Sequence, residues 1–172
     1  LNVRQRCQPL NNKEQFRFTD FYRNEVIFSF EDHPFSKNPK HVLTICHYKD
    51  KWLLTKHKSR GLEFPGGNVE NDETAKEAAV REVLEETGGI VKDLHYIGQY
   101  NVNGKKERII KNVYFATIDS LKEQETYFET EGPVLVDEIP KNVRNNRKYS
   151  FIMKDDVITF SLEYIRKKFN VN

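Results

Sequence analysis

The sequence predicts a mixed α/β sandwich, and three observations support this fold class. Two segments with helical character stand among a larger number of short apolar segments that are typical of strands. The strand-like segments surround the two helices in an order that suits a sheet packed with helices. A proline and two glycines at residues 65–67 separate one strand-like segment from the first helix by a short loop.

The composition fits one globular domain. The chain has 172 residues, of which 37% are hydrophobic and 31% charged, and it contains twelve phenylalanines and eight tyrosines. This apolar content can form a full core. The formal net charge of +2 combines an acidic central helix with basic clusters at residues 105–108 and 144–148. No large field of one sign indicates binding of long nucleic acid.

The ends and the cysteines set further expectations. Residues 1–13 are polar and show neither the helical nor the strand period of apolar residues. We therefore treat them as an N-terminal arm or extension and residues 14–172 as a single domain. Cys46 stands in an apolar run and is expected in the core. With no apolar run of eighteen residues and no signal-peptide pattern, we expect a reducing, cytoplasmic setting.

Each element follows from its local pattern. The first helix is expected to begin after Asp72 as N-cap and to end at Gly88 and Gly89, with Val80, Val83 and Thr87 facing inward. The second helix, over residues 155–169, repeats apolar residues at threes and fours after an aspartate cap. Strands are expected at residues 26–30, 41–48, 52–56, 62–64, 94–102, 108–118 and 134–138.

The first helix carries a group of carboxylates. Glu82, Glu85 and Glu86 stand at i, i+3 and i+4 and therefore share one face. Such carboxylates repel one another unless a cation joins them. Oxygen ligands without histidine or thiolate favour Mg²⁺ or Mn²⁺ over Zn²⁺. The alternative is a solvated acidic face with no ligand.

Residues 67–89 form a longer pattern around these carboxylates, G-x5-E-x7-R-E-U-x-E-E-x-G, where U is aliphatic. The pattern resembles the Nudix box of the Nudix hydrolases, which cleave nucleoside diphosphates linked to another group. The resemblance implies the Nudix-type α/β/α sandwich with a mixed β-sheet and hydrolysis of a P–O–P bond by water. One departure is Gly89, where the family pattern has an aliphatic residue. That position packs rather than reacts.

The resemblance also implies roles for the residues of the box. Glu82, Glu85 and Glu86 would hold Mg²⁺, with Mn²⁺ as a substitute, and the carbonyl of Gly66 would add a ligand. Arg81 and Glu73 would brace the helix and the loop. Either Glu82 or Glu86 could act as general base, and the motif leaves both open.

Family members often add an acidic ligand from outside the box, and Glu129 is the candidate here. The alternative is an exposed loop glutamate. Candidate substrate contacts are Arg60, Lys58, Lys111 and Gly67, with ordinary surface charge as the alternative for the three cations. Aromatic residues near Phe64 and Tyr100 could stack on a base, although core packing is the favoured interpretation of each.

The segments E-F-P-G-G, G-Q-Y, K-N-V-Y-F-A, F-E-T-E-G-P-V-L and S-F-I-M-K-D extend the resemblance to one branch. They are similar to the Bacillus-type MutT-like nucleoside triphosphatases, described as 8-oxo-dGTP diphosphatases and as RNA pyrophosphohydrolases. The first functional hypothesis is therefore hydrolysis of 8-oxo-dGTP or another (d)NTP to the monophosphate and pyrophosphate. The alternative is removal of pyrophosphate from 5′-triphosphorylated RNA. A Nudix-fold binding module without catalysis is a remote third. None of these implies a membrane or a stable protein partner.

Overall fold

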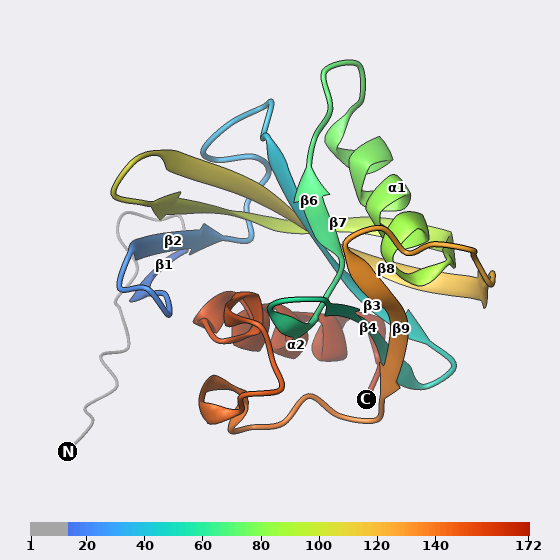
Figure 1. The fold of residues 1–172 in the computed structure, drawn as a ribbon. Helices are drawn as coiled ribbons and strands as arrows, with labels where there is room; N and C mark the ends of the chain where they lie inside the picture. The colour runs from blue at the N-terminus through green and yellow to red at the C-terminus, as the bar shows by residue number, and fades with distance from the viewer. Residues whose placement is uncertain (1–13) are drawn as a thin grey trace.

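A computed structural model describes residues 14–172 as one mixed sheet with a helix on each face (Figure 1). The strands are β1 (Gln15–Thr19), β2 (Glu25–Ser29), β3 (His41–Tyr48), β4 (Lys51–His57), β5 (Gly61–Glu63), β6 (Gly66–Asn68), β7 (Gly89–Asn103), β8 (Arg108–Leu121) and β9 (Thr130–Val136). The helices are α1 (Ala75–Thr87) and α2 (Asp156–Phe169), with short 3-10 turns η1 (Val143–Asn145) and η2 (Phe151–Met153). The predicted arm at residues 1–13 lies outside the described residues.

The sheet has the order β1-β2-β7-β8-β3-β4-β5, and β6 and β9 pair with β3 and β4. The strands β3 and β8 run parallel, with Leu43 opposite Val113, whereas the other pairs are antiparallel. The predicted mixed sheet is therefore confirmed. None of the helices in residues 14–172 is long and apolar enough to cross a membrane.

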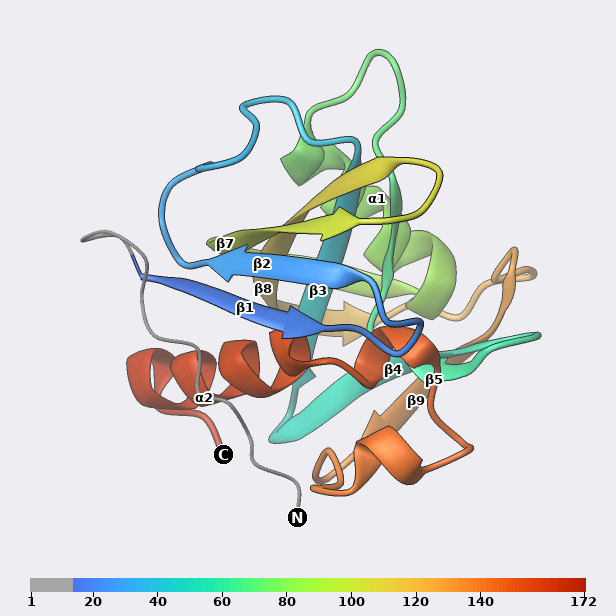
Figure 2. The same cartoon turned by 90° about the vertical axis from the view of Figure 1, so that its left-hand side faces the viewer.

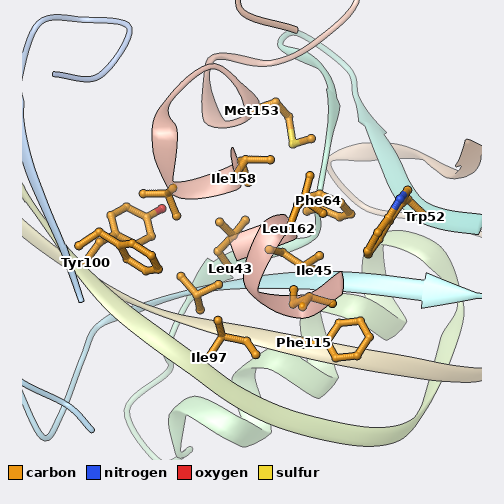
Figure 3. Close-up of a cluster of buried hydrophobic side chains, with 14 of the residues drawn as sticks. Leu43, Ile45, Trp52, Phe64, Ile97, Tyr100, Phe115, Met153, Ile158 and Leu162 are labelled. Atoms are coloured by element: carbon orange, nitrogen blue, oxygen red, sulfur yellow. The ribbon is translucent and has the colours of Figure 1, made fainter. Parts of the chain in front are cut away.

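The larger core lies between the sheet and α2 (Figure 3). Leu43, Ile45 and Phe115 of the sheet pack there against Ile158 and Leu162 of α2. Cys46, Phe64 and Tyr100 are also buried, as core packing predicted. On the other face α1 packs through small residues against smaller clusters around Val42 and Leu53.

The structure corrects two sequence predictions about α1. Its N-cap is Thr74 and not Asp72, because the Thr74 hydroxyl accepts a hydrogen bond from the Glu77 amide at 3.2 Å. Val83 and Thr87 face inward as predicted, but Val80 is 41% exposed. The apolar contact of α1 thus depends on Ala78, Ala79 and Val83.

The strands differ from the predictions mainly at their ends. The expected strand at 94–102 begins at Gly89, directly after α1, and the last strand begins at Thr130 rather than at residue 134. The strand β1 was missed because it is only five residues long and its apolar alternation consists of just Phe16 and Phe18. The glycine loop is itself a strand, since Gly66 pairs with Leu43 and a side chain there would meet the Val42 carbonyl oxygen at 2.5 Å. Only glycine permits so close an approach.

Candidate active site

The glycine strand β6 lies directly against the carboxylates of α1. The Gly66 amide donates a hydrogen bond to Glu86 Oε2 at 3.3 Å. A Cβ atom on Gly67 would collide with the carboxylate of Glu82. The missing side chains of Gly66 and Gly67 therefore give Glu82 and Glu86 their places beside the backbone of β6.

Arg81 and Glu73 join the loop after β6 to α1. The Arg81 guanidinium donates to both Glu73 oxygens, with Nη2–Oε1 at 2.6 Å and Nε–Oε2 at 3.0 Å, and Nη2 reaches the Asn68 carbonyl at 2.9 Å. These hydrogen bonds, above all, lower the pKa of Glu73. The Glu73 carboxylate also accepts from the Glu70 amide at 2.9 Å, so the loop is held at both ends.

Arg81 also contacts two of the three candidate metal ligands. Its Nη1 lies 2.9 Å from Glu82 Oε1 and 3.2 Å from Glu85 Oε2. Within residues 14–172 no three acidic, histidine or cysteine side chains converge on one point in the geometry of a metal site. A divalent cation would therefore have to compete with Arg81 for Glu82 and Glu85.

Glu86 has no cationic partner of its own within the described residues. It is 7% exposed, and burial, followed by the charges of Glu82 and Glu63, raises its pKa to about 9. Burial also raises the pKa of Glu82, against the opposing effect of Arg81. Two desolvated carboxyls with raised pKa values, one of which raises the pKa of the other, fit a cation between them, because the cation removes both the repulsion and the unmet solvation. The carboxylate oxygens are hard donors of the kind that Mg²⁺ and Mn²⁺ prefer.

Glu129 lies on the loop before β9, close enough to act on the same carboxylates. After burial and the charge of Glu85, the charge of Glu129 further raises the pKa of Glu82. The side chain of Glu129 is exposed. Its backbone is fixed, because the Glu129 carbonyl accepts from the Lys58 amide at 3.2 Å and the Lys58 ammonium reaches the Phe128 carbonyl at 2.8 Å. The structure thus brings Glu129 towards α1, and its role as a ligand stays a prediction.

A cavity of ≈ 190 Å³ opens beside β6. Gly66 and Gly67 line it together with two of the predicted substrate contacts, Arg60 and Lys111. Burial lowers the pKa of Lys111, and its ammonium has no hydrogen-bond partner among the described residues. Arg60 forms a two-pronged ion pair with the buried Glu63, at 2.8 and 3.1 Å.

Lys58 does not line this cavity. It lies in a second, more open cavity of ≈ 580 Å³, whose other basic residues are Lys56, His57, Arg60, Arg147 and Lys148. Arg60 is common to both cavities. Of the two basic clusters expected from the sequence, residues 147 and 148 reach this second cavity, whereas the cluster at 105–108 lines neither.

A family model for the Nudix domain matches residues 37–152, which is more than half of the chain. The chain belongs to the Nudix family. Nudix hydrolases act on nucleotide substrates and generally use divalent metals. The predicted family, fold and enzyme class are thereby confirmed.

A curated relative and a solved structure, both from Bacillus subtilis, are similar to this chain over most of their length. The protein named "Putative 8-oxo-dGTP diphosphatase YtkD" is 56% identical over 152 residues, which cover 88% of this chain and 96% of the relative. The crystal structure of the pyrophosphohydrolase BsRppH superposes with a TM-score of 0.89 at 54% identity, covering 91% of this chain and 99% of that one. A Nudix hydrolase from Nitrosomonas europaea, at 20% identity and a TM-score of 0.61 over 77% of this chain and 91% of that one, shows the fold alone.

The Nudix helix is held by polar residues that the sequence analysis did not single out. The hydroxyls of Thr55 and Thr130 donate to the Glu86 carbonyl at 3.0 and 3.1 Å. The side-chain amide of Gln124 donates to the Leu84 carbonyl at 2.8 Å. These residues come from β4, β9 and the loop between β8 and β9, so no local spacing could have connected them to the box.

Proposed function

We propose that this Nudix hydrolase converts a nucleoside triphosphate, either 8-oxo-dGTP or another (d)NTP, to the monophosphate and pyrophosphate with Mg²⁺ as its cofactor. The observation that carries the proposal is the contact of Glu82 and Glu86 with Gly67 and Gly66 of β6, the strand that also lines the cavity containing the side chains of Arg60 and Lys111. The relative named as an 8-oxo-dGTP diphosphatase supports the substrate class.

In this proposal Glu82, Glu85 and Glu86 hold the metal, with the Gly66 carbonyl and Glu129 as further ligands. When bound, Mg²⁺ neutralises phosphate charge and acidifies the attacking water. Arg81 and Glu73 fix the direction of the ligands, since one guanidinium joins the loop, the helix and the carboxylates.

In this proposal the proton of the attacking water goes to one of the carboxylates of α1. Glu82 and Glu86 both have raised pKa values, so either is a stronger base than an exposed glutamate would be. Arg60 and Lys111 supply positive charge beside the phosphates, and Gly67 lets the substrate approach the backbone.

Hydrolysis of 5′-triphosphorylated RNA ends is the second candidate, and the second cavity favours it. Arg147 and Lys148 make no ion pair among the described residues and line an open basin that reaches the first cavity through Arg60. Such a basin suits phosphodiesters that continue away from the 5′ end. The similarity to BsRppH, named a pyrophosphohydrolase, also fits this candidate.

The test is a comparison of kcat/KM for a panel of nucleotides, including 8-oxo-dGTP, and for 5′-triphosphorylated RNA. Each substrate is measured with Mg²⁺, with Mn²⁺ and with EDTA. Full activity in EDTA, or no turnover of any triphosphate with either metal, would contradict the proposal. Replacing Arg144, Arg147 and Lys148 together by alanine should lower RNA turnover and its salt sensitivity while nucleotide turnover holds.

A further inference from the structure

Two buried threonine hydroxyls meet at the C-terminal end of α1. The Thr55 hydroxyl, from β4, donates to the Glu86 carbonyl at 3.0 Å, and the Thr130 hydroxyl, from β9, donates to the same carbonyl at 3.1 Å. Thr55 is 0% exposed and Thr130 is 3% exposed. Hydrogen bonds in such a dry setting are stronger than in water, so the peptide group of Glu86 is fixed by two separate strands.

The same two hydroxyls hold residues 127–132, the segment that leads into β9. The Thr130 hydroxyl lies 3.2 Å from the Tyr127 carbonyl, and it accepts from the Gly132 amide at 3.2 Å. The Thr55 hydroxyl lies 3.1 Å from the Gly132 carbonyl. Each hydroxyl proton is therefore shared between the end of α1 and one end of this segment. We call Thr55 and Thr130 the threonine bridge.

Glu129 lies inside the bridged segment and directly precedes Thr130. Its peptide is also held by Lys58, whose amide donates to the Glu129 carbonyl at 3.2 Å and whose ammonium reaches the Phe128 carbonyl at 2.8 Å. Phe128 has a φ of 60°, in the left-handed region that residues other than glycine rarely adopt. The backbone thus turns sharply just before Glu129, and the direction of its side chain depends on the contacts that fix this turn.

The bridge joins the two elements that carry the candidate metal ligands. Figure 2 shows the loop between β8 and β9 beside the end of α1, and the side-chain amide of Gln124 in this loop also donates to the Leu84 carbonyl at 2.8 Å. The charge of Glu129 acts on the carboxyl of Glu82. The backbone that bears Glu86 and the backbone that bears Glu129 are therefore tied together within one residue of each glutamate.

We propose that Thr55 and Thr130 are positioning residues that fix the Glu129 carboxylate relative to the carboxylates of α1, so that the two elements hold one metal ion together. Hydrogen bonds behind the ligands commonly set ligand direction in metal sites. The hydroxyl is needed rather than the bulk of the side chain, because only hydrogen bonds reach both backbones. Thr44 of β3 provides a contrast, since its hydroxyl is buried without a hydrogen-bond partner among the described residues. The inference rests on the proposed function, in which Glu129 is a metal ligand.

The test is a double-mutant cycle that measures kcat/KM for a nucleoside triphosphate and the Mg²⁺ concentration at half-maximal rate. Thr130→Val keeps the shape of the side chain without its hydroxyl, and it should lower kcat/KM by roughly tenfold and raise the Mg²⁺ requirement. In a Glu129→Ala protein the same change should alter kcat/KM by less than about twofold, because the carboxylate that the hydroxyl positions is absent. Thr130→Ser should restore activity, and Thr44→Val should leave it unchanged.

Thr55→Val is the second variant, which replaces Thr130→Val if the latter does not fold, and it should show the same dependence on Glu129. Equal losses with and without the Glu129 carboxylate would show that the hydroxyls act on α1 alone, and they would overturn the inference. Activity of Thr130→Val equal to that of Thr44→Val would overturn it as well.

The rise of the melting temperature with Mg²⁺ follows the same cycle without hydrolysis, because a ligand of the folded state stabilises it. The rise should be smaller in Thr130→Val than in Thr44→Val, and equal in Glu129→Ala and in the double variant. This pattern supports the bridge even if no triphosphate is turned over, a result that would contradict the proposed function. Active protein whose two substitutions act independently overturns only the bridge, and an unaltered protein without any response to Mg²⁺ overturns both.

Discussion

The helices α1 and α2 cover opposite faces of one sheet and are nearly equal in length, with 13 and 14 residues, but they are built for different tasks (Figure 1). Helix α2 inserts Ile158, Leu162 and Ile165 into the larger core. Helix α1 meets the sheet mainly through Ala78 and Ala79. The small side chains of Ala78 and Ala79 let α1 lie close to the sheet, and its glutamate side chains therefore reach β6. One helix stabilises the fold, and the other positions the chemistry.

The ends of the two helices show the same division. The last turn of α2 carries Arg166, Lys167 and Lys168, which complement the negative end of the helix dipole. The last turn of α1 has no basic residue and instead carries Glu85 and Glu86. Hydrogen bonds from other elements to its final carbonyls offset this cost. The preference for basic residues in the last turn of a helix is thus broken where the candidate ligands lie, which is typical of functional sites.

The largest expected effect of a single substitution is on activity and lies in α1. Glu86→Gln should lower kcat/KM by about a hundredfold or more, because it removes a charged ligand or base from the reaction. The folded protein without metal should lose little stability. Since the pKa of Glu86 is raised to about 9, its carboxyl is protonated at neutral pH before metal binds, and glutamine resembles that form. Steady-state kinetics and thermal melting measure the two effects.

Metal titration provides the control for Glu86→Gln. Mg²⁺ should raise the melting temperature of the unaltered protein, since a ligand that binds only the folded state stabilises it. The variant should show a smaller rise at the same concentration. A variant with full activity, or with the same metal-dependent rise, would remove Glu86 from the ligand set.

A core substitution in α2 should lower stability and leave activity almost unchanged, the opposite of the effect of Glu86→Gln. Leu162→Ala creates a cavity in the larger core and should reduce the free energy of unfolding by about 2–5 kcal/mol. Well below its melting temperature the variant should retain near-normal kcat/KM. Val80→Ala, at an exposed position of α1, is the matched control and should change stability by about 0.5 kcal/mol or less. A Leu162→Ala variant that is stable but inactive would contradict this division between the helices.

The sequence predicted the different tasks of α1 and α2 well where the pattern was local. The spacing of Glu82, Glu85 and Glu86 placed the carboxylates on one face, and the apolar period of residues 155–169 located α2 within one residue. The cap of α1 was assigned two residues too early, because both Asp72 and Thr74 are good caps and only tertiary contacts of the loop choose between them.

Non-local contacts account for what the sequence could not predict. The strand character of Gly66 and Gly67 comes from pairing with β3, which lies more than twenty residues earlier in the chain. Thr55, Thr130 and Gln124 hold the end of α1 from three distant segments. The rings of Tyr22 and Phe151 likewise meet across most of the chain, with centroids 5.0 Å apart. Periodicity reports the neighbours of a residue in sequence, and these contacts are neighbours only in space.

Glu129 tests whether the chemistry of α1 extends to the loop before β9. Glu129→Ala should lower kcat on the order of tenfold to a hundredfold if its carboxylate acts on the metal or the water. Thermal stability should change little, because an exposed loop carboxylate contributes little to folding. Glu131→Ala, two residues later and paired with Lys56 at 3.1 Å, is the control and should keep its activity. Equal activity of the two variants would place Glu129 outside the site.

The smallest expected effect concerns the N-terminal end of α2, where the residue that caps the helix lies near the candidate active site. The Asp155 carboxylate caps α2 by accepting from the Val157 amide at 2.9 Å. Burial raises the pKa of Asp155 to about 7, with smaller contributions from the charges of Asp20 and Asp156, while the Val157 amide and Lys111 oppose the rise. Lys111 lines the cavity beside β6, so the cap of the structural helix faces a candidate substrate contact. The buried Tyr100 faces the same carboxylate.

Asp155→Asn removes this titration and keeps the cap, because asparagine caps helices as well as aspartate does. A carboxyl whose pKa is raised on folding favours the folded state below its unfolded pKa of about 4, and this contribution is lost as the pH rises through about 7. The variant should therefore gain stability relative to the unaltered protein between pH 6 and pH 7. Lys111 opposes this gain, because its charge stabilises the ionised carboxylate that the variant lacks. We expect the difference in melting temperature to shift by roughly 2–4 °C in favour of the variant, about 1 kcal/mol. A difference that stays constant with pH, or that shifts the other way, would show that Asp155 is ionised throughout and that Lys111 holds it as an ordinary ion pair.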